Sequence, residues 1–156
     1  MNRVLVGYVS IVMFLALSSI GCGQGGVRVF TGDAVTGVAR QAGEVLERDS
    51  GHSLVVISAT AESLQQRLES ELADVIFMAS STIDALEKAN RFVPGTRVDV
   101  ARASGGGGQP PTIYSAAMMA TGENFEGARA FLRTLVSEEG RAAVTAAGLE
   151  PIDPAR

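Results

Sequence analysis

Few side chains in this sequence are suited to catalysis or metal binding. The 156 residues include one cysteine, Cys22, and one histidine, His52. A Cys/His zinc site, an iron–sulfur cluster and an intramolecular disulfide each need more of these residues, so the chain alone cannot form any of them. His52 lies in the segment Asp-Ser-Gly-His-Ser, which is typical of a turn. We therefore expect no metal site, and an exposed loop histidine rather than a catalytic base.

Three aspartates remain as candidates for acid–base catalysis: Asp33, Asp74 and Asp84. Their spacing compels no pair to meet, and nothing around them resembles a catalytic motif. Asp74 directly precedes an apolar run, where a structural role is more common. Met118 and Met119 lack the third sulfur or histidine of a metal–thioether site, which favours packing in the core. We expect a binding protein and not an enzyme, and a small exported enzyme is the least favoured alternative.

Residues 1–22 have the pattern of a signal peptide. Arg3 precedes an apolar run of about 17 residues, which is followed by small residues. The end of the segment, Ser19-Ile20-Gly21-Cys22, resembles the bacterial lipoprotein box, although Ser19 stands where that box usually has leucine. The resemblance implies a lipid on Cys22. Simple secretion and a retained transmembrane anchor stay open as alternatives, and all three place the remaining chain outside the cytoplasm.

The charge balance of the exported part excludes one class of partner. Removing residues 1–21 takes away one of the 13 basic residues, so 22–156 hold 12 basic and 17 acidic side chains and a net charge of −5. This balance excludes the basic surface of a nucleic-acid-binding domain. Residues 23–26, Gly-Gln-Gly-Gly, have the composition of a flexible tether. About 135 residues are enough for one hydrophobic core, so we expect a single domain.

Strand and helix patterns alternate in the first half of the exported chain. The β-branched runs at 27–30, 54–57 and 73–78 predict three strands, and the second is so continuously apolar that we expect burial on both faces. Apolar side chains spaced by three and four predict helices after the strands, with Ser81 and Asp84 forming a box-like cap for the third helix. This order predicts a three-layer α/β domain with a mainly parallel sheet flanked by helices.

The pattern changes in the second half. Short strands are predicted at 98–101 and 112–119, on either side of a Gly/Pro-rich loop at 103–111. Two helices follow, and we expect the second to end at Gly148 in a left-handed cap.

Segments from both halves resemble the periplasmic molybdate-binding proteins of ABC importers. The N-terminal resemblance rests on Val29-Phe30-Thr31-Gly32-Asp33-Ala34-Val35-Thr36 and on Leu64-Gln65-Gln66-Arg67-Leu68-Glu69 leading into Ala73-Asp74-Val75. The C-terminal resemblance rests on Ile113-Tyr114-Ser115-Ala116-Ala117, Ala128-Arg129-Ala130-Phe131-Leu132, Ser137-Glu138-Glu139-Gly140 and Ala147-Gly148-Leu149-Glu150-Pro151. Neighbouring solute-binding families share these motifs, so the resemblance extends to the type II solute-binding protein superfamily.

The resemblance implies one lobe of a two-lobed fold. Members of this family bind their ligand between two lobes, and the second lobe is an insertion between the two halves of the first. Here the Gly/Pro-rich loop 103–111 stands in place of that insertion. We therefore expect residues 27–152 to form a single α/β lobe of a type II periplasmic binding protein, which cannot close around a ligand by a hinge motion.

The resemblance also implies a ligand site at two helix N-termini. Such proteins hold an oxyanion with backbone N–H groups and with two serines, one after the first strand and one before the second helix. Those serines align with Ala34 and Ala61, whose backbone N–H groups remain as donors. Thr31, Thr60 and Ser58 are substitute hydroxyl donors, although capping and turn formation are their usual roles. Asp33 adds a negative charge that repels a bound anion.

These patterns predict an exported solute-binding lipoprotein that needs no cofactor and binds molybdate or tungstate. Its partners would be an ABC permease in the cytoplasmic membrane and, through the lipid on Cys22, the membrane surface. We expect it in the periplasm or on the outer face of the cytoplasmic membrane. Because both serine hydroxyls and the second lobe are missing, the patterns also fit a degenerate member of the family. The alternative is a one-lobe envelope module that binds another protein and no small molecule.

Overall fold

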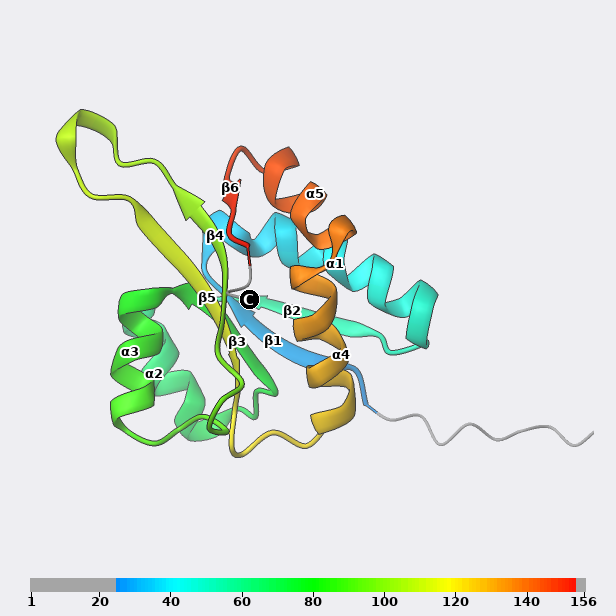
Figure 1. Ribbon diagram of the computed structural model, residues 1–156. Helices are drawn as coiled ribbons and strands as arrows, with labels where there is room; N and C mark the ends of the chain where they lie inside the picture. The colour runs from blue at the N-terminus through cyan, green and yellow to red at the C-terminus, as the bar shows by residue number, and fades with distance from the viewer. Residues whose placement is uncertain (1–24, 154–156) are drawn as a thin grey trace, which may run out of the picture.

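The computed structural model describes residues 25–153, in which a six-stranded sheet carries helices on both faces (Figure 1). The strands are β1 (Val27–Thr31), β2 (Leu54–Ser58), β3 (Val75–Ala79), β4 (Val98–Ala103), β5 (Thr112–Met118) and β6 (Glu150–Pro151). The helices are α1 (Asp33–Ser50), α2 (Ala61–Ser70), α3 (Ser80–Lys88), α4 (Phe125–Val136) and α5 (Glu138–Ala146). In space the strands follow the order β2-β1-β3-β5-β4-β6.

The sheet is parallel in its first half and antiparallel in its second. β1 lies between β2 and β3 and runs parallel to both. β5 is antiparallel to β3, and β4 is antiparallel to β5 and β6. The expectation of a mainly parallel sheet is therefore right for the first three strands, while the complete sheet is mixed. The connection at 104–111 is too short for a crossover helix, so β4 and β5 pair as a hairpin.

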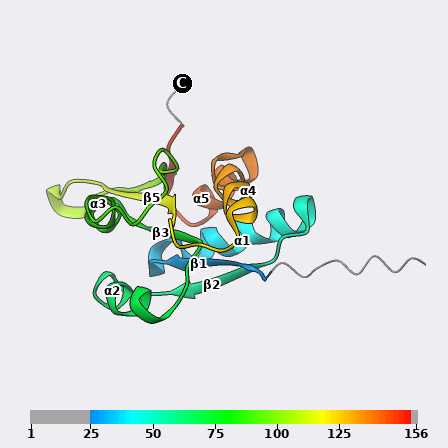
Figure 2. The same cartoon turned by 90° about the horizontal axis from the view of Figure 1, so that it is seen from below.

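The sheet separates two hydrophobic clusters. α1, α4 and α5 cover one face, where Val29 and Phe77 are fully buried. α2 and α3 cover the other face, where Phe30 is fully buried. Figure 2 shows α1, α4 and α5 above the first strands and α2 below them. Met118 and Met119 are fully buried in opposite clusters, because neighbouring side chains of a strand point to opposite faces. The three-layer architecture and the core role of both methionines are confirmed.

β2 lies at one edge of the sheet. Its side chains are partly buried or exposed, and Val55 is 45% exposed. The expectation that this strand is buried on both faces is wrong. Its apolar composition is that of a central strand, but the strand order gives it β1 as its one neighbour.

α3 begins without the predicted side-chain cap. β3 ends at Ala79 and the helix starts at Ser80, so the strand leads directly into the helix. Ser81 lies inside the first turn, and no cap of the predicted kind forms with Asp84. Asp84 instead accepts a hydrogen bond of 2.5 Å from Nη1 of Arg97.

The Gly/Pro-rich segment joins β4 to β5 as an exposed loop. Ala103 pairs with Thr112, and a short 3-10 turn at Gly106–Gly108 lies between them. Gly107 and Gly108 have φ values of 66° and 83°, which glycine adopts without strain. Figure 1 shows the loop extending away from the helices. That it stands in place of a second lobe stays a prediction.

The predicted signal peptide, Cys22 and the first residues of the tether lie outside the described residues. Within 25–153, no helix is both long and apolar enough to cross a membrane. Gly148 follows α5 with a φ of 76°, which confirms the left-handed cap.

Candidate functional site

The carboxyl ends of β1, β2 and β3 meet at one edge of the sheet, where α1, α2 and α3 begin. The three strands are parallel, and Thr31 at the end of β1 pairs with Ser58 at the end of β2. The N–H of Ala59 donates to the carbonyl oxygen of Thr31 at 2.9 Å, which joins the two strand ends. Ligands of open α/β sheets bind at such edges. The structure places Thr31, Ala34, Thr60 and Ala61 on this edge.

Thr31 is fully buried and its hydroxyl has a partner within the chain. Its Oγ1 lies 2.8 Å from Oγ1 of Thr36, which itself donates to the carbonyl oxygen of Gly32 at 3.0 Å. Because each hydroxyl has one proton, Thr31 donates to Thr36. This pair fastens the first turn of α1 to the end of β1. Thr31 would have to give up this bond to reach a ligand.

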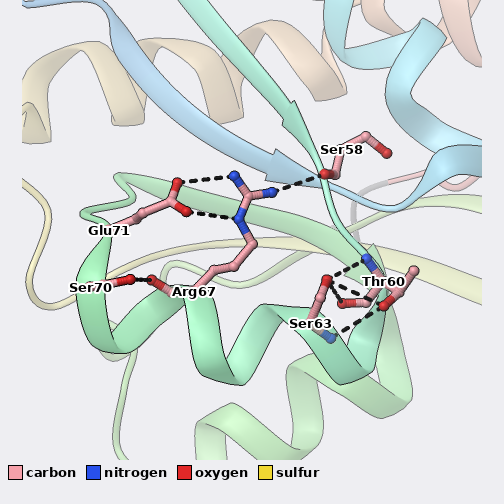
Figure 3. Close-up of polar contacts among 6 residues, drawn as sticks. All are labelled: Ser58, Thr60, Ser63, Arg67, Ser70 and Glu71. Carbon is pink, nitrogen blue, oxygen red and sulfur yellow. Dashed lines mark hydrogen bonds and ion pairs between the residues drawn. The ribbon is translucent and has the colours of Figure 1, made fainter.

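Thr60 caps α2. Its Oγ1 accepts the N–H of Ser63 at 3.2 Å, and Oγ of Ser63 accepts the N–H of Thr60 at 3.1 Å (Figure 3). This reciprocal pair is a capping box, which satisfies two backbone donors at the helix start. The capping role expected for Thr60 is confirmed.

Ala34 and Ala61 lie exposed in the first turns of α1 and α2. The first N–H groups of an α-helix have no acceptor within the helix and carry the positive end of the helix dipole. With methyl side chains, these two residues leave the backbone of each first turn accessible. They are the positions through which the two helices present donors to solvent.

A carboxylate accompanies each of these helix starts. Asp33, the first residue of α1, is exposed and accepts a hydrogen bond from Oγ of Ser58. Glu62 lies in the first turn of α2, where hydrogen bonds from its own backbone N–H and from the Thr60 hydroxyl lower the pKa of its carboxyl group. Both carboxylates oppose the approach of an anion. Sequence reasoning found Asp33 and missed Glu62, although an acid at the start of a helix is an ordinary pattern.

Arg67, which contacts the end of β2, is neutralised within the chain. Nε and Nη2 of Arg67 donate to the two carboxylate oxygens of Glu71 at 2.9 and 3.0 Å, and Nη1 donates to the carbonyl oxygen of Ser58 at 3.2 Å (Figure 3). The hydrogen bond from Arg67 lowers the pKa of the Glu71 carboxyl group. The guanidinium carbon of Arg67 lies 5.0 Å from the ring centroid of Phe30. Arg67 therefore covers the core beside the edge strand and does not offer a free charge to the site.

A chain of hydrogen bonds links α3 to β4 near the same edge. Oγ of Ser115 donates to Oδ1 of Asp99 at 2.5 Å, so the 2.6 Å contact between Ser80 and Ser115 has Ser80 as the donor. Arg97 holds Asp99 from the other side, with Nε 3.6 Å from Oδ1. Sequence reasoning missed this network, because only the antiparallel pairing of β5 with β3 and β4 brings the two serines and the aspartate together.

A cavity of about 270 Å³ opens between α2 and α3. Ala61, Leu64 and Leu86 line it together with the hydroxyl-bearing Ser81 and Thr82. Ala61 thus belongs both to the first turn of α2 and to the wall of this cavity. Of the four predicted site residues, it has the surroundings that best suit a small solute.

The remaining chemical candidates lie apart from one another. Asp74 is buried directly before β3, at the end of the parallel strands opposite the candidate site. It accepts the N–H groups of Arg28, Glu123 and Asn124, each at 2.8 Å. This arrangement confirms the structural role expected for Asp74. His52 lies partly buried in the loop between α1 and β2, so its loop position is confirmed and its full exposure is not. In the described part of the chain, no group of three or more histidine, cysteine, aspartate or glutamate residues could hold a metal ion.

No family model and no curated protein matches this sequence, but solved structures share its fold. The substrate-binding domain of a putative molybdenum ABC transporter from Clostridium difficile has a TM-score of 0.72 at 12% identity, over 82% of this chain and 99% of that one. The Azotobacter vinelandii periplasmic molybdate-binding protein has a TM-score of 0.69 at 13% identity, over 79% of this chain and 98% of that one. Iron-bound HitA from Pseudomonas aeruginosa has a TM-score of 0.66 at 12% identity, over 82% of this chain and 86% of that one. The fold is that of a periplasmic solute-binding protein domain.

This likeness shows the fold and does not identify a ligand. Two of the neighbours are described with molybdenum or molybdate and the third with iron, so one fold accommodates different solutes. The first two are named as binding proteins, and the third is iron-bound. What this chain binds is therefore a question for its own residues.

Proposed function

We propose that this chain is an exported solute-binding protein that holds a small oxyanion, molybdate or tungstate, and delivers it to an ABC permease. One observation carries the proposal: α1 and α2 bring their first turns to one edge of the sheet, in a fold shared with solute-binding proteins. Helix N-termini are ready-made anion sites, because they combine unpaired N–H groups with the positive end of a dipole. The protein would act in the periplasm or on the outer face of the cytoplasmic membrane, with a lipid on Cys22.

The proposed donors are the backbone N–H groups of Ala34 and Ala61. The Thr31 and Thr60 hydroxyls serve as secondary donors, because both are already hydrogen-bonded within the chain. Asp33 keeps the Ser58 hydroxyl occupied and adds a negative charge beside the site. Binding should therefore be weak, and it should strengthen when hydroxyl groups are added or the charge of Asp33 is removed. The protein performs capture and release and no covalent step.

Thermal unfolding with and without added anions tests this function. A ligand at about 100 times its Kd adds roughly 2.7 kcal/mol to the folded state, which corresponds to a rise in Tm of roughly 10 °C for a domain of this size. We expect molybdate and tungstate to raise Tm, and sulfate and phosphate to raise it less. The double variant A34S/A61S should increase the rise with molybdate, whereas Ala142→Ser, an exposed substitution on α5, should leave it unchanged. No rise with any of the four anions, in wild type and in A34S/A61S, would refute oxyanion binding.

The second candidate function is a one-lobe envelope module that binds another protein. The carboxylates at both helix starts favour it, because Asp33 and Glu62 take up donors that an anion would need. This function predicts that a specific partner co-purifies from envelope extracts and that substitutions of Thr31 and Thr60 leave its capture unchanged. Loss of the partner from those variants would argue against the module.

A further inference from the structure

Three large apolar side chains are exposed around the point where the chain enters the sheet, at the end of the parallel strands opposite the candidate site. We call them the N-terminal patch: Val55, Leu72 and Phe125, exposed to 45, 42 and 43%. Exposed apolar side chains that gather at one pole indicate an interaction surface more strongly than scattered ones.

Contacts around Gly25 and Gly26 place the three side chains at this pole. A Cβ atom on Gly26 would lie 3.2 Å from Cγ2 of Val55. Phe125 and Gly25 line one cavity of about 310 Å³, and Nδ2 of Asn124 donates to the carbonyl oxygen of Gly25 at 3.1 Å.

The hydrogen bonds of Asp74 place Leu72 at the same end of the sheet. The N–H of Asp74, two residues after Leu72, donates to the carbonyl oxygen of Arg28 at 2.8 Å, and its carboxylate accepts the N–H of Asn124, the residue before Phe125. The N-terminal patch therefore surrounds the start of β1.

The preceding chain ties this pole to a membrane. Two residues separate Cys22 from Gly25, and a fully extended chain covers at most about 11 Å over these three residue steps. An apolar run of about 17 residues comes before Cys22, at the lower limit for spanning a bilayer. A lipid on Cys22 would hold Gly25, beside the N-terminal patch, within about 11 Å of the lipid surface, and an anchor in the apolar run ending at Ile20 would allow about 18 Å.

We infer that the N-terminal patch docks on the phospholipid surface that holds the chain, with Leu72 and Phe125 in the headgroup layer. Leucine and phenylalanine are typical of interfacial contacts, and a short tether keeps the effective concentration of the surface high. Glu123 and Glu126 are exposed beside Phe125, so their charge favours zwitterionic over anionic phospholipids. The inference rests on the proposed membrane attachment and does not depend on solute binding.

Docking would set the direction in which the candidate site faces. β1 runs from Val27 beside the N-terminal patch to Thr31 at the site, a rise of about 13 Å over four residue steps. The first turns of α1 and α2 would then face away from the lipid and stay open to solutes. Delivery to a permease in the same membrane would require the domain to leave the lipid surface.

Single tryptophan variants test this geometry, because the natural sequence contains no tryptophan. Phe125→Trp and Leu72→Trp report on the N-terminal patch, and Ser81→Trp, exposed at the start of α3, is the matched control at the opposite edge. The full chain is reconstituted in phosphatidylcholine vesicles with and without brominated acyl chains, and flotation measures attachment. We expect blue-shifted emission and a loss of intensity in brominated vesicles for the two patch variants, and neither change for Ser81→Trp. Raising the fraction of phosphatidylglycerol should weaken both effects.

Four results would overturn the inference, and they separate it from the proposed attachment. Flotation without quenching at positions 72 and 125 would refute docking and leave attachment standing. Equal quenching at positions 81 and 125 would show that the domain has no preferred orientation on the surface. Absence of flotation would refute attachment and docking together. A blue shift without vesicles that grows with protein concentration would show that a second copy of the chain covers the patch instead.

Discussion

Replacing Asp74 should destabilise the domain more than replacing any other aspartate considered above. This carboxylate is 5% exposed and accepts three backbone N–H groups at 2.8 Å, from Arg28 at the start of β1 and from Glu123 and Asn124 before α4. A hydrogen bond to a charged group contributes about 1.5–3 kcal/mol. Asp74→Ala removes three such bonds, and water can reach the part-buried donors, so we expect the low end of their sum, a loss of about 5 kcal/mol in the free energy of unfolding.

Asp74→Asn gives a graded comparison. The amide oxygen can still accept the N–H groups of Glu123 and Asn124, but the amide nitrogen then faces the N–H of Arg28. One hydrogen bond is lost, so we expect a loss of about 2 kcal/mol. Asp84→Asn is the matched control, because its exposed ion pair with Arg97 should contribute less than about 1 kcal/mol.

Urea unfolding followed by circular dichroism measures these differences. The m value shows whether the variants expose the same surface area when they unfold. A typical domain has a stability of about 5–15 kcal/mol, so Asp74→Ala should remove about a third of the stability or more. Equal stability of Asp74→Asn and Asp84→Asn, within about 0.5 kcal/mol, would refute the assignment of Asp74 as the anchor between β1 and α4.

Three further predictions concern the helix starts. Thr60→Ala should lower the free energy of unfolding by about 1 kcal/mol, because Ser63 loses its cap, and calorimetry should show only a small loss of molybdate affinity, because the hydroxyl is a secondary donor beside the backbone groups. Glu62 has a lowered pKa in the folded state, so its contribution to stability is present above its unfolded pKa and is lost as pH falls through the folded value; Glu62→Gln should flatten the pH dependence of Tm in that acidic range. Asp33→Asn removes a charge that repels an anion and should raise molybdate affinity about fivefold, by about 1 kcal/mol, in a titration at low salt; an unchanged affinity would place the ligand away from α1.

Much of the local structure could be predicted from residue patterns. The run at 27–30 corresponds to β1 (Val27–Thr31), and the expected strand at 112–119 corresponds to β5 (Thr112–Met118). The helices could be predicted equally well, because a helix buries one stripe of side chains that recurs at a fixed spacing. The edge that carries the candidate site was also predictable, since parallel strands bring their carboxyl ends to one side of the sheet.

Pairing across long stretches of chain was not predictable in the same way. An apolar run such as β2 has the same composition in the centre or at the edge of a sheet, and only its neighbours decide its exposure. Such pairings also decide which hydroxyl groups at the candidate site are already hydrogen-bonded within the chain. Thr31 is a donor by residue type, but its buried position beside Thr36 uses its hydroxyl, and Ser58 meets Asp33 only because β1 and β2 are adjacent.

The sequence by itself predicted the alternation of strands and helices and the end of the parallel strands that carries the candidate site. These features depend on composition and on short-range periodicity, which a single chain carries in its order of residues. Only the tertiary structure decided which hydroxyls are free, which carboxylates stand at the helix starts, and which apolar side chains stay exposed beside Gly25 and Gly26. Those properties belong to contacts between residues distant in sequence, and such contacts exist only once the strands have paired.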